Sequence, residues 1–131
     1  MQEKRGFERM VLDGHMYIKT RGKNPLTLRV FLDDFSFGGF AVYSPEKLKK
    51  GRVIEFNLIT QVLDQGLVGK AKIRHVSQPP ECSTPLYTIG AQFLEVNKDL
   101  VTYIINRIQA KMVLQMQARK EVAEALDFMV Y

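Results

Sequence analysis

Two groups of residues in the first third of the chain have the types and spacing that a phosphate-bearing ligand requires. The first contains two arginines four residues apart, Arg5 and Arg9, and the second is an Asp-x-Ser-x-x-Gly run formed by Asp34, Ser36 and Gly39. Arginine presents a planar, permanently charged fork that binds phosphate, pairs with guanine and stacks on bases. Aspartate accepts hydrogen bonds from guanine N–H groups, a serine hydroxyl donates to phosphate, and glycine lets backbone approach a ligand closely. The two groups together predict a site that a dinucleotide could bridge.

The segments that must position these residues alternate apolar and polar side chains with period two, which is typical of half-buried strands. The runs lie at about residues 10–19, 26–33, 38–43, 54–58, 67–74 and 87–93. Turn-forming residues separate them. Six short strands at this spacing predict a closed antiparallel barrel, because closure removes exposed sheet edges.

The period changes near Asn97, which is a plausible helix N-cap followed by Asp99 in the first turn. Apolar residues then recur at helical spacing: Leu100, Ile104, Ile105, Ile108, Met112 and Met116. We therefore predict a single, mainly β domain with a flexible arginine segment at 1–9, a barrel at 10–97 and a long helix at 98–131. Beyond about Lys111 this helix should outrun the barrel and need a partner; the alternative is a break near Gln117.

Composition excludes several classes of protein. The chain has 131 residues, of which 46% are hydrophobic and 25% charged, as in an ordinary globular domain. It has no apolar run of membrane-spanning length and its start does not resemble a secretory signal, while one cysteine, Cys82, fits a reducing cytoplasm. His15, His75 and Cys82 have no metal-ligand spacing, and Ser36 lacks a catalytic context. We expect neither a metal site nor an enzyme. The net charge of +5, concentrated in residues 1–24, favours an anionic partner.

In this order, and with a β-rich segment between them, the two motifs resemble the PilZ domain, a family that binds the bacterial second messenger cyclic di-GMP. The resemblance extends over about residues 5–110. It implies a six-stranded barrel followed by a helix. It also implies a non-enzymatic cytoplasmic receptor that changes conformation on binding and signals to a partner protein, such as motility or secretion machinery.

The resemblance also assigns roles to individual residues. Arg5 and Arg9 would clamp guanine faces and phosphates. Asp34 would bind a guanine edge or its ribose, Ser36 would bind a phosphate or base, and Gly39 would keep the wall of the site clear. Lys4 precedes the first arginine, a position that influences how many ligand molecules family members bind, and it is a candidate additional contact.

Two alternatives remain open from the sequence. One is a PilZ-like adaptor that binds proteins through its C-terminal helix and takes no ligand; the helix could also form a homo-oligomer. The other is a small basic barrel that binds single-stranded nucleic acid on stacking aromatics such as Phe35, Phe37 and Phe40. Lys70, Lys72 and Arg74 share one strand face, which we interpret as solvated and not as a nucleic-acid strip.

Overall fold

A computed structural model describes residues 14–78 and 86–129 of the chain. The predicted arginine segment at 1–9, including Lys4, Arg5 and Arg9, lies outside the described residues, as does Cys82.

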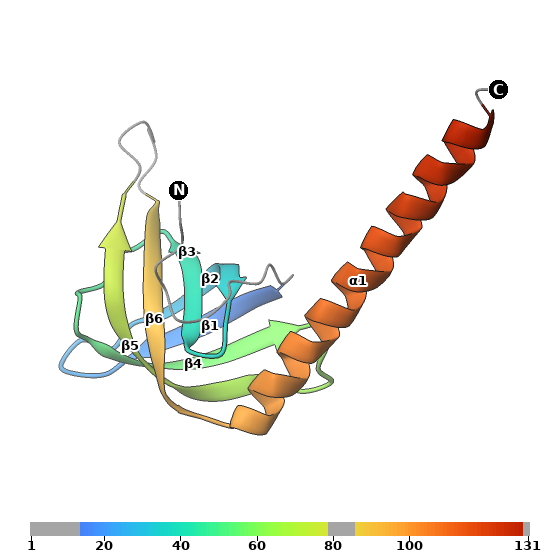
Figure 1. Ribbon diagram of the computed structural model, residues 1–131. Coiled ribbons are helices and arrows are strands. Elements are labelled where there is room, and N and C mark those ends of the chain that lie inside the picture. Colours follow the sequence, from blue (N-terminus) through green and yellow to red (C-terminus); the bar gives the residue numbers. More distant parts are fainter. Residues whose placement is uncertain (1–13, 79–85, 130–131) are drawn as a thin grey trace.

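Six strands close into one antiparallel barrel, followed by a single helix (Figure 1). The strands follow one another around the barrel in the order β1-β2-β3-β6-β5-β4. The elements are β1 (Gly14–Thr20), β2 (Thr27–Phe35), β3 (Gly39–Ser44), β4 (Val53–Thr60), β5 (Leu67–Ser77), β6 (Tyr87–Val96) and α1 (Lys98–Met129). This architecture confirms the predicted mainly β fold.

The barrel interior is filled by the inward-facing side chains of the strands, which alternate with outward-facing ones. On β4, for example, Ile54, Phe56 and Leu58 are all buried. Four phenylalanine rings form an edge-on and tilted cluster, with centroids 5.1 to 5.8 Å apart in the pairs Phe35–Phe93, Phe40–Phe56, Phe40–Phe93 and Phe56–Phe93. Such geometry suits the aromatic quadrupole.

Burial of two of these rings weakens the nucleic-acid alternative. That alternative named Phe35, Phe37 and Phe40 as examples of stacking rings, but Phe35 and Phe40 are 0% and 4% exposed. Of the three, Phe37 alone is exposed, at 46%. These three residues therefore do not form a row of exposed rings, which stacking of successive bases on them would require.

Helix α1 begins at the predicted cap. The Asn97 Oδ1 atom accepts hydrogen bonds from the backbone N–H groups of Asp99 at 3.0 Å and Leu100 at 3.2 Å. These bonds satisfy donors that the first helical turn leaves without partners. The first turns then pack on the barrel core through Val101, Ile104, Ile105 and Ile108.

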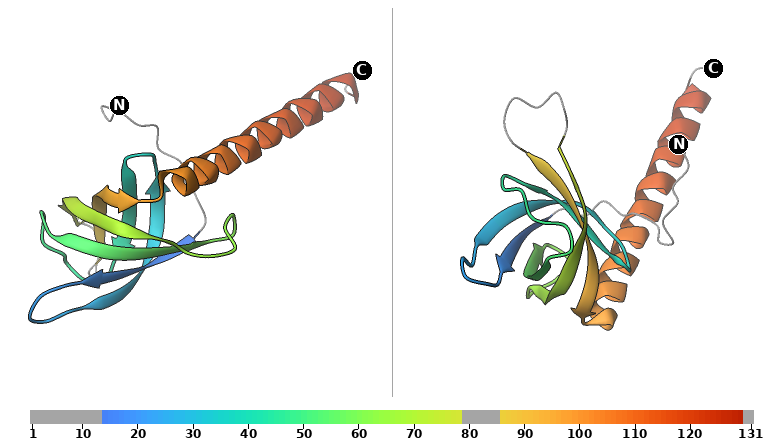
Figure 2. Two further views of the ribbon diagram at one scale, coloured as in Figure 1. Left: turned by 90° about the horizontal axis from the view of Figure 1, so that it is seen from below. Right: turned by 90° about the vertical axis from the view of Figure 1, so that its left-hand side faces the viewer.

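The remainder of α1 leaves the barrel without a break near Gln117, and it continues to Met129. Figures 1 and 2 show it projecting well past the strands. Every residue from 109 to 126 is exposed, and we call this segment the distal helix. Although α1 is long, no helix among the described residues is apolar enough to cross a membrane.

Candidate functional site

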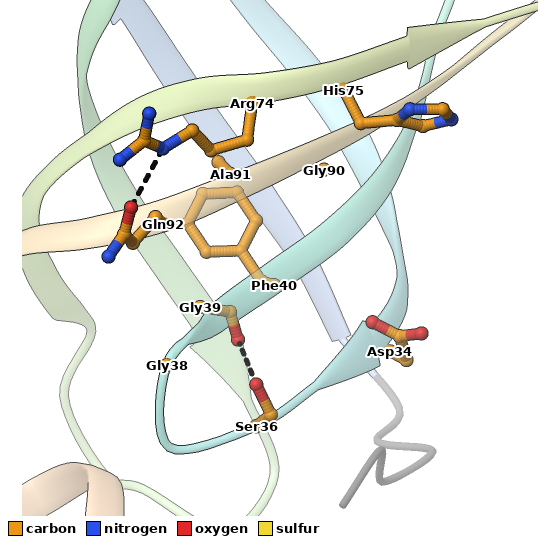
Figure 3. Close-up of a pocket in the computed structure, with 10 residues that line it drawn as sticks. All are labelled: Asp34, Ser36, Gly38, Gly39, Phe40, Arg74, His75, Gly90, Ala91 and Gln92. Atoms are coloured by element: carbon orange, nitrogen blue, oxygen red, sulfur yellow. Dashed lines mark hydrogen bonds between the residues drawn. The ribbon is translucent and has the colours of Figure 1, made fainter. Parts of the chain in front are cut away.

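An open pocket of about 370 Å³ lies across the outer wall of four neighbouring strands, β2, β3, β6 and β5 (Figure 3). The β2–β3 hairpin contributes Asp34, Ser36, Gly38, Gly39 and Phe40. The β5–β6 pair contributes Arg74, His75, Gly90, Ala91 and Gln92. The pocket therefore brings together the three residues of the predicted Asp-x-Ser-x-x-Gly motif, and adds a second group that the sequence reasoning did not assign to it.

A β-bulge aims Asp34 at this pocket. Leu32 pairs with Val42 and Asp34 pairs with Ala41, so that Asp33 is an extra residue without a counterpart on β3. An extra residue inverts the in–out alternation that follows it. Asp34 consequently lies on the outer wall, while Phe35 is turned into the core. Asp34 is only 6% exposed, so its carboxylate lies in a sheltered part of the wall.

The neighbouring carboxylate faces a different partner. Asp33 accepts a hydrogen bond from the Tyr43 hydroxyl at 2.9 Å and does not line the pocket. The bulge thus separates two adjacent aspartates, one supporting the sheet surface and the other supplying the pocket.

Ser36 closes the turn between β2 and β3. Its backbone N–H donates to the Gly39 carbonyl at 2.9 Å, and its hydroxyl donates to the same oxygen at 3.3 Å. The hydroxyl would have to rotate away from this long bond to donate to a ligand. As an acceptor, the hydroxyl oxygen can use its two lone pairs without this rotation.

Gly39 is required by the barrel itself. A Cβ atom at this position would lie 1.9 Å from the Ala91 carbonyl oxygen on β6, a distance that no real contact allows. The absence of a side chain therefore lets β3 and β6 pair here. This structural role exists whether or not a ligand binds.

A second bulge places Arg74 and His75 on the opposite side of the pocket. Ile73 pairs with Ala91 and His75 pairs with Gly90, leaving Arg74 as the extra residue on β5. The Arg74 Nε atom donates to the Gln92 Oε1 atom at 2.7 Å, as Figure 3 shows. Arg74 is exposed, as predicted for a solvated strand face, and it also lines the pocket.

A separate surface ion pair carries clear pKa shifts. The Arg21 guanidinium, which follows β1, donates a hydrogen bond to Glu55 on β4. This bond lowers the pKa of the Glu55 carboxyl and raises the pKa of Arg21. Neither residue lines the pocket.

A comparison with protein families adds a decisive observation: the PilZ domain model matches residues 3–110. The chain belongs to the PilZ family. A comparison with curated proteins gives no match. The PilZ model covers the barrel, the first turns of α1 and both sequence motifs.

Solved structures show the same PilZ fold. MrkH of K. pneumonia in complex with c-di-GMP is 19% identical, with a TM-score of 0.65 over 91% of this chain and 56% of MrkH. YcgR of Escherichia coli in complex with c-di-GMP is 17% identical, with a TM-score of 0.62 over 94% of this chain and 51% of YcgR. The Bacillus subtilis inhibitor of motility, MotI/DgrA, is 12% identical, with a TM-score of 0.64 over 86% and 52%. The chain spans about half the length of these proteins.

Proposed function

We propose that this PilZ domain is a non-enzymatic receptor for cyclic di-GMP. The observation that carries the proposal is the pocket on the outer wall, where the bulge presents Asp34 beside Ser36. Structures of YcgR and MrkH, which share the fold, are complexes with this ligand. A sheltered carboxylate in an otherwise basic chain suits recognition of a base edge, because carboxylates accept hydrogen bonds from guanine N–H groups.

The N-terminal arginines complete the proposed site. Arg5 and Arg9 would bring positive charge to the phosphates and guanine faces, which the aspartate cannot contact favourably. Binding would order residues 1–9 over the pocket and change the surface that the domain presents. Lys4 would add a further cationic contact. The ligand is then a switch and not a substrate.

The altered surface must be recognised by another protein, and the distal helix supplies exposed apolar side chains. Its large apolar residues are 45 to 66% exposed: Met112, Val113, Leu114, Met116, Val122 and Leu126. A second copy of this chain, or a cytoplasmic partner such as motility or secretion machinery, would cover them. One fold relative is an inhibitor of motility.

The decisive experiment is calorimetric titration with cyclic di-GMP, using the two aspartates of the bulge as a matched pair. Asp34→Asn removes the charge from the pocket, whereas Asp33→Asn removes the same charge from its neighbour outside it. A charge-assisted hydrogen bond contributes about 1.5–3 kcal/mol, so Asp34→Asn should weaken binding roughly 10- to 100-fold. Asp33→Asn should bind nearly as wild type.

A second candidate function is favoured by the distal helix alone. In this case the domain is an adaptor that works through protein contacts and takes no ligand. A wild-type chain that releases no heat with cyclic di-GMP, and shows no displacement of a labelled analogue, would select the adaptor. A competing single-stranded oligonucleotide in the same titration tests the nucleic-acid alternative.

A further inference from the structure

Two glycines of the pocket lie on neighbouring strands, but the fold needs only one of them. Gly39 has no room for a Cβ atom. At Gly90 a Cβ atom would meet only the His75 Cβ atom, at 3.5 Å, which is an ordinary contact. The backbone at Gly90 does not have the positive φ that favours glycine. Because glycine weakens a strand interior, its presence on β6 calls for another reason.

Gly90 lies in a row of outward-facing residues that crosses the pocket. Asp34 pairs with Ala41, Ala41 pairs with Gly90, and Gly90 pairs with His75. Adjacent strands are about 4.8 Å apart, so the two polar ends of the row are roughly 14 Å from each other. Of the two residues between them, Ala41 is only 3% exposed and does not line the pocket, so the open part of the floor is the bare backbone at Gly90. Such a floor is flat enough for a purine base to lie against it.

Arg74 stands beside this floor with its guanidinium already oriented. The bond from its Nε atom to Gln92 fixes one edge of the guanidinium, and leaves the Nη atoms as donors. Guanine presents two acceptors, O6 and N7, at the spacing that an arginine fork matches. Adenine presents a donor where guanine has O6, so the same fork distinguishes the two bases.

We propose that Gly90 and Arg74 form a second base-binding wall of the pocket. The wall receives a guanine of cyclic di-GMP flat on Gly90, with its O6 and N7 edge directed toward Arg74. Asp34 and Ser36, on the opposite side, then serve the remainder of the ligand. This inference rests on the proposed function and adds residues that neither motif contains.

The floor is tested by adding bulk at one position. Gly90→Leu should weaken cyclic di-GMP binding at least about 10-fold, because the side chain would occupy the base position. Gly90→Ala, which adds a single methyl group, should lose much less. Thr88→Leu adds bulk to the same strand outside the pocket and should bind as wild type. A folded Gly90→Leu variant with wild-type affinity would overturn the floor.

The arginine edge is tested by charge-matched variants on one strand, which also serves if Gly90→Leu does not fold. Arg74→Gln should lose roughly 10- to 100-fold in affinity for cyclic di-GMP and most of its preference over cyclic di-AMP. Lys72→Gln removes the same charge two residues away and should leave that preference unchanged. Equal losses in both variants would show that only net charge matters, and would overturn the assignment.

The two levels of inference fail in different ways. A wild-type chain that does not bind cyclic di-GMP refutes the proposed function, and the second wall with it. A wild-type chain that binds, together with Gly90→Leu and Arg74→Gln variants of unchanged affinity, refutes the second wall alone.

Discussion

The pocket on the barrel wall and the distal helix are built in opposite ways. The pocket is concave and combines polar side chains with an apolar floor, and its residues lie on strands that are hydrogen-bonded on both sides. The distal helix is a single, exposed element with six large apolar side chains and no barrel beneath it. The hydrogen-bonded strands fix the positions of the pocket side chains to the accuracy that base recognition would need. The distal helix offers exposed apolar surface but no cavity, which suits a partner protein that supplies the other half of the interface.

The largest expected effect sharpens this contrast within one helix. Ile104→Ala creates a cavity where α1 packs on the core, and should lower the free energy of unfolding by about 2–5 kcal/mol. Leu114→Ala removes a similar side chain that is 66% exposed, and should change the stability of the monomer very little. Urea denaturation of both variants at low protein concentration provides the measurement. Equal losses would mean that the distal helix is packed against something in the isolated chain.

Arg9→Ala should separate the ligand from the fold. Lost charge-assisted contacts, each about 1.5–3 kcal/mol, should weaken cyclic di-GMP binding roughly 10- to 100-fold. Arg5→Ala should act similarly, and Lys23→Ala, an exposed basic residue in the β1–β2 loop, should not. Titration calorimetry gives the affinities and thermal denaturation confirms folding. Wild-type binding by both arginine variants would show that the site has been assigned wrongly.

The distal helix should control assembly without affecting the pocket. Basic residues precede acidic ones along this part of α1: Arg107, Lys111, Arg119 and Lys120 come before Glu121 and Glu124. Two copies paired antiparallel would therefore set opposite charges against each other, whereas parallel pairing would align like charges. Deleting residues 113–131 should convert an oligomer to a monomer in sedimentation while cyclic di-GMP affinity stays constant.

A full-length chain that sediments as a monomer at high concentration would eliminate self-association. Docking of the distal helix to a different protein would then be the remaining way to cover its apolar side chains.

Ligand binding should also order the N-terminal segment. Cyclic di-GMP should protect the backbone around Arg5 and Arg9 from hydrogen exchange and protease, since the proposed clamp holds both arginines against the pocket. The distal helix should show no change in a monomeric variant. Protection limited to residues 34–39 would contradict the clamp.

The smallest effect concerns the barrel surface outside both regions. The hydrogen bond from Arg21 lowers the pKa of Glu55. The pair therefore stabilises the fold above the unfolded-state pKa of Glu55, and this contribution is lost as pH falls through the lowered folded-state pKa. Arg21→Gln should make stability less dependent on acid pH, by a small amount because the pair is exposed. Urea midpoints measured from about pH 3 to 7 would detect the change, because the midpoint of the variant should vary less with pH than that of the wild type.

The sequence predicts the positions of the strands and the helix better than it predicts which side of a strand each residue faces. Period-two patterns located six strands, and Asn97 marked the start of the helix, because both signals are local. The bulges at Asp33 and Arg74 are set by pairing with strands distant in sequence, so no local pattern announces them. For this reason the motif predicted Asp34 as a site residue, whereas no local pattern indicated that the exposed Arg74 also lines the pocket.

Glycine shows the same limit in a different form. Gly39 belongs to a recognisable motif, yet its environment shows a requirement of strand packing. Gly90 belongs to a generic strand pattern, yet the fold leaves it room for a side chain. Only the three-dimensional surroundings separate a glycine that the barrel needs from one that a ligand would need.

The unbroken course of α1 has a mechanical consequence. Its base is held by the barrel core as far as Ile108, and Leu126 lies about 27 Å farther along the axis at 1.5 Å per residue. A rotation of only about 10° at the base would displace that end by roughly 5 Å, since an intact helix transmits the tilt over its whole length. The helix can therefore act as a lever arm, in which the displacement of the tip for a given tilt increases with the number of residues between the core and the tip.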